Sequence, residues 1–195
     1  MKNILLTGKM GVGKSEVAKI LCKTYGYTRY AMADWLKNTI NSHYGLVNPK
    51  KSDLIDINGV LKTYRRVLQE FGTECIRKFD NNWHITELLN SIDKKKLPFV
   101  IDDIRFENEI DKISKKYECI VINIECDEVE RVIRICKRDG LVPDEYMNNH
   151  SSENLLVNSD FSIDTTYGYN NVEYQLKMIL DKINIPCYNR SIINK

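Results

Sequence analysis

The sequence lacks a long apolar run and a marked excess of charge, and each absence argues against a class of protein. No stretch of about 18 consecutive apolar residues occurs among the 195 residues, so we expect no membrane span. The first predicted strand begins almost at Met1, which leaves no room for a signal peptide. The net charge is only +2 and no segment is strongly basic, which argues against nucleic acid as a partner. We therefore expect a cytoplasmic protein that binds neither membranes nor nucleic acid.

Cysteine pairs of the Cys-x-x-Cys kind are also absent. The six cysteines are spread along the chain, and several fall at apolar positions of predicted elements, where a free cysteine behaves as a small hydrophobic residue. We expect no disulfides and no zinc site, as is usual in a reducing cytoplasm. The length suits one domain, so we predict a single domain over residues 1–195.

What the sequence does contain, close to its start, is a complete phosphate-binding loop. The loop is Gly8-Lys9-Met10-Gly11-Val12-Gly13-Lys14-Ser15, followed at once by Glu16. An apolar strand precedes it and an amphipathic helical pattern follows it, which is the context that makes this motif specific. We expect its N–H groups to hold the phosphates of ATP, Lys14 to reach the β- and γ-phosphates, and the Ser15 hydroxyl to bind Mg²⁺.

The rest of the chain alternates between short apolar strands and amphipathic helices. The predicted strands are 3–7, 28–31, 99–102, 119–124 and 161–164. The predicted helices are 14–25, 33–43, 60–79, 82–93, 106–116, 127–138 and 171–183, with loops over 44–58 and 140–158. This pattern predicts a three-layer α/β fold of the P-loop NTPase type, with a parallel sheet of about five strands between helices. Ligands of such folds bind at the carboxyl ends of the strands.

Two aspartates end one of these strands. Asp102 and Asp103 stand where a carboxylate can hold Mg²⁺ directly or through water. The alternative is that one of them only caps a helix. Arg105 follows and is expected to face the same crevice, unless it pairs with Glu107 or Glu109 on the next helix.

Three arginines share one helix face. Arg131, Arg134 and Arg138 are spaced by three and four residues, so they can close together over a transferring phosphate. We expect them, with Lys14 and Arg105, to be catalytic, and we predict a lid over about 127–153. The alternative is a solvated face whose arginines pair with Glu128 and Glu130.

Several classes of phosphate-loop protein fit poorly. The sequence has no Asn-Lys-x-Asp, with which a GTPase is expected to read guanine, and it is too short for a transporter ATPase. The small kinases remain, in which a compact core carries a helical region for the phosphoryl acceptor and an arginine-bearing lid.

At this level the sequence resembles the deoxynucleoside monophosphate kinases of tailed bacteriophages and, more distantly, phosphomevalonate kinase. The resemblance rests on segments 8–15, 30–37, 65–74 with Arg77, Asp80 and Trp83, 100–109, and 150–153. It implies an acceptor-binding insertion over about 33–93. The residues that the resemblance places at the acceptor are Asp34, Lys37, Arg65, Gln69, Gly72, Thr73, Arg77, Trp83, Asp103, Arg105 and His150.

Some of these assignments have simpler alternatives. Gln69 suits the reading of a base because its amide can form two hydrogen bonds, but a glutamine on a helix surface is also common. Trp83 could stack on a base or pack in the core. His150 could belong to the lid or be an ordinary polar loop residue.

The hypothesis that follows is transfer of the γ-phosphoryl group of ATP to a (deoxy)nucleoside monophosphate in the presence of Mg²⁺. The alternatives are a kinase for another small phosphorylated metabolite and a regulatory protein that binds nucleotide without catalysis. We expect small-molecule nucleotides as partners and a monomer or homodimer.

Overall fold

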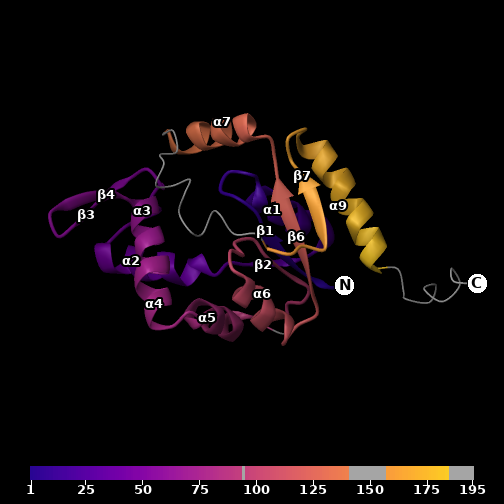
Figure 1. Ribbon diagram of the computed structural model, residues 1–195, viewed down its shortest axis with the longest axis horizontal. Coiled ribbons are helices and arrows are strands. Elements are labelled where there is room, and N and C mark those ends of the chain that lie inside the picture. Colours follow the sequence, from indigo (N-terminus) through magenta and orange to yellow (C-terminus); the bar gives the residue numbers. More distant parts are fainter. Residues whose placement is uncertain (94, 141–156, 185–195) are drawn as a thin grey trace, which may run out of the picture.

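The computed structural model describes residues 1–93, 95–140 and 157–184, and its centre is a five-stranded parallel sheet. The strands are β1 (Asn3–Thr7), β2 (Thr28–Tyr30), β5 (Phe99–Ile101), β6 (Cys119–Glu125) and β7 (Phe161–Asp164). Their order across the sheet is β2-β5-β1-β6-β7, which puts β1 in the middle (Figure 1). The phosphate loop therefore leaves the sheet from its central strand.

Helices cover both faces of this sheet. They are α1 (Lys14–Tyr25), α5 (Trp83–Ser91), α6 (Glu107–Ser114) and α9 (Tyr169–Asn184), whereas α7 (Glu128–Asp139) lies against the phosphate loop. Successive side chains of a strand point to opposite faces. Accordingly, Ile4 and Leu6 of β1 belong to a core with α1 and α9, whereas Leu5 belongs to a core with α5 and α6. The predicted three-layer fold is confirmed.

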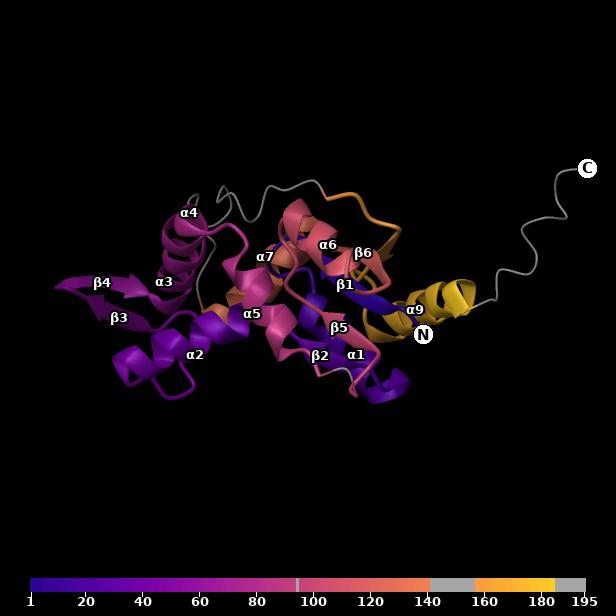
Figure 2. The same cartoon turned by 90° about the horizontal axis from the view of Figure 1, so that it is seen from below.

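A second region lies beside the sheet, at the opposite end from α9 (Figures 1 and 2). It consists of α2 (Ala33–Tyr44), the hairpin β3 (Leu54–Ile57) and β4 (Val60–Thr63), α3 (Tyr64–Gln69), a π-helical segment (Glu70–Ile76) and α4 (Arg77–Phe79). It has its own small core, in which Leu36 and Ile40 of α2 meet Ile55 of the hairpin and Val67 of α3. This region forms one wall of the cavity described below.

The hairpin corrects two predictions, a loop over 44–58 and a single helix over 60–79. Asn58 and Gly59 both have positive φ, at 54° and 85°, which is the turn that joins two strands most tightly. The helix begins only at Tyr64, because the Thr63 side chain accepts a hydrogen bond from the N–H of Arg66 and so caps it.

The other predicted elements are present with ends shifted by a few residues. Of the predicted lid, α7 is described, and its remainder, including His150, lies outside the described residues. In the part of the chain that the structure describes, we find no helix with the length and apolar character needed to cross a membrane.

Candidate functional site

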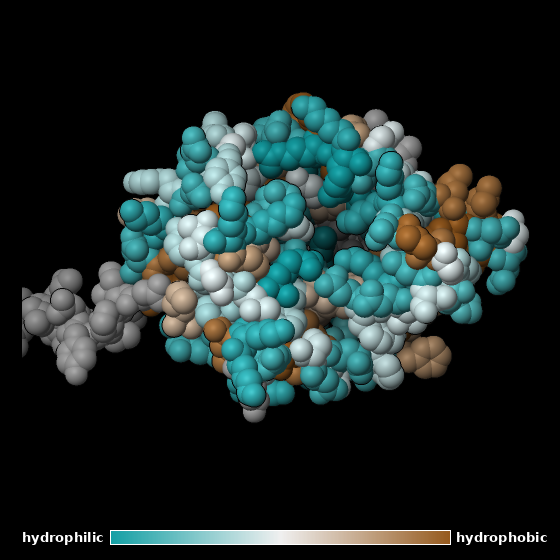
Figure 3. Space-filling view, turned by 180° about the vertical axis from the view of Figure 1, so that it is seen from behind, coloured by the Kyte–Doolittle hydropathy of each residue, from teal (hydrophilic) through white to brown (hydrophobic). Residues whose placement is uncertain are grey.

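A cavity of about 820 Å³ opens at the carboxyl ends of the central strands. Its lining comes from the phosphate loop, from α2 and α3, from the segment that follows β5, and from α7. Figure 3 shows one face of the molecule, which is hollowed near its middle and bordered mostly by hydrophilic side chains. A typical pocket for one small ligand measures about 300–1,000 Å³, so this cavity stands at the large end of that range.

The loop at one side of the cavity needs its glycines. Gly8, Gly11 and Gly13 have φ of 131°, 87° and 102°, a region that other residues adopt only with strain. A Cβ on Gly8 would lie 2.1 Å from the carbonyl oxygen of Ile124, so no larger residue fits there. The buried Lys14 ammonium donates to the carbonyl oxygens of Gly8 and Lys9, at 2.5 and 2.7 Å, and it thereby closes the loop on itself.

The two aspartates after β5 have different roles. Both oxygens of Asp103 accept hydrogen bonds, from the N–H groups of Met32 and Ala33 at 2.9 and 2.8 Å. Asp103 therefore holds the start of α2, and burial raises its pKa. It also lines the cavity, so its role at the metal and at the acceptor stays a prediction. Asp102 is buried and forms an ion pair with Arg29 of β2 at 2.9 Å. It lines the cavity together with Ser15, so both stay candidates for Mg²⁺.

Arg29 was not predicted as a site residue. It joins Asp102 to α2, because it also pairs with Asp34 at 3.2 Å, and Asp34 in turn pairs with Lys37 at 3.0 Å. Lys37 lines the cavity, whereas Asp34 positions the two cations beside it. A lone arginine in a short strand carries no motif, so no signal in the sequence marked it.

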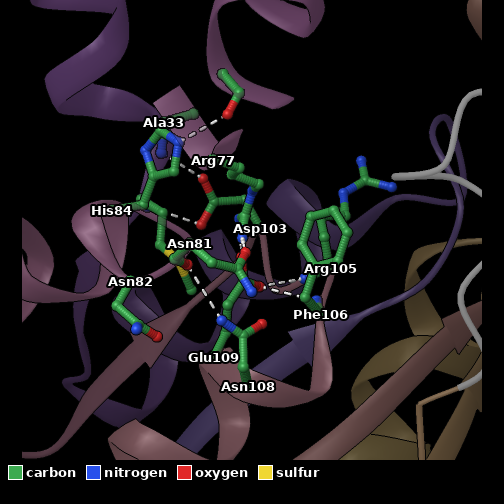
Figure 4. A network of polar contacts seen from close by, with 12 residues as sticks. Ala33, Arg77, Asn81, Asn82, His84, Asp103, Arg105, Phe106, Asn108 and Glu109 are labelled. Carbon is green, nitrogen blue, oxygen red and sulfur yellow. Dashed lines mark hydrogen bonds and ion pairs between the residues drawn. The ribbon is translucent and has the colours of Figure 1, made fainter. Parts of the chain in front are cut away.

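A buried carboxylate organises the arginines at the far side of the cavity (Figure 4). Glu109 of α6 accepts hydrogen bonds from the N–H groups of Arg105 and Phe106, at 2.7 and 3.0 Å, and forms an ion pair with Arg77. The Arg77 guanidinium lies 3.9 Å from the centre of the Phe106 ring. Burial raises the pKa of Glu109, and the charge of Arg77 opposes that rise. Glu109 thus fixes two arginines that line the cavity.

Arg105 points back toward the phosphate loop. Glu109 binds its backbone N–H, and its guanidinium donates to the carbonyl oxygen of Gly8 at 3.3 Å. The predicted alternative, a side-chain ion pair with Glu107 or Glu109, is not the contact that we find. Arg105 therefore spans the distance between the loop and the second group of cations.

Gln69, Gly72 and His84 line the cavity between α3 and α5. The Gln69 amide oxygen is buried and has no hydrogen-bond partner in the described structure. His84 donates from Nε2 to the Gly72 carbonyl oxygen at 3.0 Å, and burial lowers its pKa. Trp83 lies outside the lining and packs on Trp35 with ring centres 5.9 Å apart, and its contact with the acceptor stays a prediction. The side chain of the predicted Thr73 lies outside the described structure.

Helix α7 packs directly on the phosphate loop. A Cβ on Gly11 would lie 2.7 Å from Cγ1 of Ile135, which shows how closely the two approach. Arg131 is buried, donates to the Met10 carbonyl oxygen at 3.0 Å and pairs with Glu128. Arg131 thus binds the loop in this structure, and its role over the transferring phosphate stays a prediction.

The other two arginines of α7 line the cavity. Arg134 pairs with Glu130 and donates to the hydroxyl and carbonyl oxygens of Thr165, both at 2.8 Å. The Thr165 hydroxyl donates to the Val12 carbonyl oxygen at 2.6 Å, so Arg134 also steadies the loop. Arg138 pairs with Asp139 at 2.8 Å, and Asp139 pairs with the buried Arg65 of α3. The predicted pairing with Glu130 thus coexists with access of Arg134 to the cavity, whereas Arg131, which pairs with Glu128, is not part of the lining.

The sequence matches the model of one known protein family. The family model described as 50S ribosome-binding GTPase matches residues 3–135. No curated protein matches the sequence.

Solved structures that are similar include three kinases. A gluconokinase from Sinorhizobium meliloti is 15% identical with a TM-score of 0.56, and the match covers 93% of this chain and 95% of that one. A shikimate kinase from Acinetobacter baumannii in complex with shikimate is 17% identical with a TM-score of 0.53, and the match covers 93% of this chain and 94% of that one. A shikimate kinase from Bacteroides thetaiotaomicron is 13% identical with a TM-score of 0.55, and the match covers 93% of this chain and 98% of that one. At these identities the similarity establishes a shared fold and no more.

Proposed function

Because the chain belongs to the family described as 50S ribosome-binding GTPase, whose phosphate loop it contains in full, we propose that its activity begins with a bound nucleoside triphosphate. We propose further that it is an ATP-dependent kinase that transfers the γ-phosphoryl group to a (deoxy)nucleoside monophosphate. The observation that carries this proposal is a cavity that joins the loop to a second group of cations and to the Gln69 amide oxygen, which has no hydrogen-bond partner among the described residues.

The donor side of the cavity suits Mg²⁺ and triphosphate. Mg²⁺ prefers oxygen ligands and usually takes only one or two from the protein, which matches Ser15 and Asp102. A Mg²⁺ ion held by these residues would supply positive charge that offsets the charge of the phosphates. Lys14 and the N–H groups of the loop hold those phosphates in a fixed orientation.

The acceptor side offers positive charge and a group that can read a base. Lys37, Arg77 and Arg105 line the cavity and suit a second phosphate, which guanidinium groups bind well through two parallel hydrogen bonds. A buried amide oxygen without a partner costs about 1–3 kcal/mol, so Gln69 gains from a ligand that donates to it. The N–H groups on the edge of a nucleobase are such donors.

This arrangement also explains why no residue is needed as a strong base. A phosphate acceptor is already an anion near neutral pH, so catalysis consists of positioning and of neutralising charge. Arg105 is well placed for the second task, because it contacts the loop from the acceptor side.

Two alternatives predict different results. A kinase for another small phosphorylated metabolite would use the same cations but would not need Gln69. A regulatory protein that hydrolyses GTP slowly is favoured by the description of the matched family, although the sequence has no Asn-Lys-x-Asp segment.

The test is a coupled assay that measures formation of nucleoside diphosphate from a panel of ribo- and deoxyribonucleoside monophosphates with ATP or GTP. We expect ADP formation that depends on one or a few monophosphates. Gln69→Ala should raise KM for the monophosphate by about tenfold, the equivalent of one hydrogen bond at about 1.4 kcal/mol, and leave KM for ATP unchanged. Hydrolysis of either triphosphate that no monophosphate accelerates would refute the proposal.

A further inference from the structure

A chain of ion pairs runs from the metal side of the cavity to helix α2. It begins at Asp102, whose Oδ1 lies 2.9 Å from Nη2 of Arg29. The other terminal nitrogen of the same guanidinium, Nη1, lies 3.2 Å from Oδ2 of Asp34. The second Asp34 oxygen, Oδ1, lies 3.0 Å from the ammonium of Lys37. Alternating charges thus connect a candidate Mg²⁺ ligand to a cation that the proposed function assigns to the acceptor phosphate.

Asp102, at the first end of this chain of ion pairs, has the properties of a ligand for a divalent cation. Its side chain is only 2% exposed, and among the described residues its one ion pair is that with Arg29. Its Oδ1 has no hydrogen-bond partner in the part of the chain that the structure describes, so the carboxylate can accept a further ligand. Buried carboxylate oxygens of this kind suit Mg²⁺, which prefers oxygen ligands.

Asp102 cannot give its full charge to Arg29 and to Mg²⁺ at once. Like charges beside one carboxylate repel each other, so Arg29 loses part of its attraction to Asp102 when that carboxylate also serves a metal ion. The Arg29 side chain is 37% exposed and already contacts Asp34, toward which it can move. Asp34 then interacts more strongly with Arg29 and less strongly with Lys37, because one carboxylate divides its charge between the two cations. The Lys37 ammonium thereby becomes available to an anion in the cavity.

We infer that Arg29 is a positioning residue that links the use of Asp102 by Mg²⁺ to the release of Lys37 for the acceptor phosphate. The inference rests on the proposed function, since it takes Lys37 as part of the acceptor site. The link requires both terminal nitrogens of the guanidinium, because each contacts a different carboxylate. A lysine in its place carries one compact ammonium, which can neutralise Asp102 without holding Asp34 at the same time.

The effect on binding is modest. Asp34 and Lys37 are 45% and 34% exposed, and an ion pair at such a position contributes little. Releasing Lys37 from it therefore changes the affinity for an anion by about threefold. Coupling of this kind is reciprocal, so an anion on the acceptor side strengthens the binding of Mg²⁺ by the same factor.

The experiment measures how strongly an anion binds on the acceptor side with and without Mg²⁺. Sulfate is the probe, titrated by calorimetry into the full chain saturated with adenylyl imidodiphosphate, an ATP analogue that occupies the phosphate loop and is not hydrolysed. Mg²⁺ should tighten sulfate binding in every variant, because it offsets the charge of the analogue. We expect the gain to be about threefold larger in the parent than in Arg29→Lys.

Asp34→Asn tests the other end of the link. It removes the carboxylate that holds Lys37, so without Mg²⁺ it should bind sulfate about threefold more tightly than the parent does. Its further gain with Mg²⁺ should be no larger than that of Arg29→Lys. Asp181→Asn, at an exposed position of α9, is the matched control for loss of a carboxylate and should change neither value.

Stability separates this link from simple neutralisation of a buried charge. Arg29→Met leaves the buried Asp102 carboxylate without a positive partner, so its midpoint of unfolding in urea should fall below that of Arg29→Lys, which keeps the charge. If Arg29 served the fold alone, Arg29→Lys would resemble the parent in sulfate binding as well. We expect Arg29→Lys to keep most of the stability and to lose the coupling.

Equal gains with Mg²⁺ in the parent and in Arg29→Lys would overturn the inference. An unchanged metal-free sulfate affinity in Asp34→Asn would overturn it equally, and this result remains accessible if the Arg29 variants do not fold. The expected coupling in a protein that phosphorylates no monophosphate would uphold the role of Arg29 and refute the proposed function. Phosphorylation of a monophosphate by a protein whose sulfate binding does not distinguish the parent from Arg29→Lys would do the reverse.

Discussion

The contact between Gly11 and α7 can be tested by adding a single methyl group. In Gly11→Ala the new Cβ would lie 2.7 and 2.8 Å from Cγ1 and Cδ1 of Ile135, a side chain that is 1% exposed. Something must move to make room, and forcing an extra carbon into a packed interior costs about 1–3 kcal/mol. The positive φ of 87° adds about 1–2 kcal/mol of backbone strain.

Gly26→Ala separates these two contributions. Gly26 has φ of 72° at the end of α1, and a Cβ there meets nothing within 4 Å. Its substitution therefore carries the backbone strain alone. We expect Gly11→Ala to lower the free energy of unfolding by about 1–3 kcal/mol more than Gly26→Ala does. Equilibrium unfolding in urea, followed by tryptophan fluorescence, measures both values.

A double variant identifies the partner. Ile135→Ala removes the carbons that collide with the new methyl, at a cost of about 2–5 kcal/mol of its own. In combination with Gly11→Ala, the loss should be smaller than the sum of the two single losses by about 1–3 kcal/mol. Equal effects of Gly11→Ala and Gly26→Ala, or strictly additive losses in the double variant, would show that α7 does not lie on the loop as described.

Two further predictions concern the carboxylates of the site. Glu109→Gln leaves the Arg77 guanidinium without its buried carboxylate partner, so it should lower the free energy of unfolding in urea by about 3–5 kcal/mol. Adding Arg77→Met should recover part of that loss, and an unchanged stability in Glu109→Gln would contradict the ion pair. Asp102→Asn should weaken the Mg²⁺ dependence of activity. By contrast, Asp103→Asn should leave that dependence unchanged and lower the free energy of unfolding by about 1 kcal/mol, because it impairs the cap of α2. A Mg²⁺ titration of activity measures both variants, and a loss of Mg²⁺ dependence in Asp103→Asn but not in Asp102→Asn would make Asp103 the metal ligand.

The sheet and its loop could be predicted because local sequence determines them. Five apolar runs spaced by amphipathic helices leave few ways to cover both faces of a sheet, and the phosphate loop needs glycines at fixed places. The β3–β4 hairpin was missed although Asn58-Gly59 is a strong turn signal. The hairpin exposes apolar side chains to water, since more than half of the surface of Leu54, Val60 and Leu61 is exposed. The alternation of apolar and polar residues that marks a half-buried strand is therefore absent there.

The side-chain partners at the site could not be predicted in the same way. Whether Asp103 binds a metal or caps a helix depends on where α2 begins in space, and only the fold brings Met32 and Ala33 to that carboxylate. Lys51 belongs to a segment that resembles an ordinary polar loop. Its pKa is lowered to about 7 by burial and by the charges of Arg65 and Arg138, which are distant in sequence. Pairings of this kind are set by tertiary structure.

The hydrogen bond from Thr165 to the carbonyl oxygen of Val12 has a consequence for the order of events in synthesis. It joins Val12, which lies within the phosphate loop, to a residue 153 positions later in the chain. A nascent chain emerges from its amino end, so the loop is made early but waits for β7 and the residue after it. We therefore expect the loop to reach its described geometry only once β7 and Thr165 are in place.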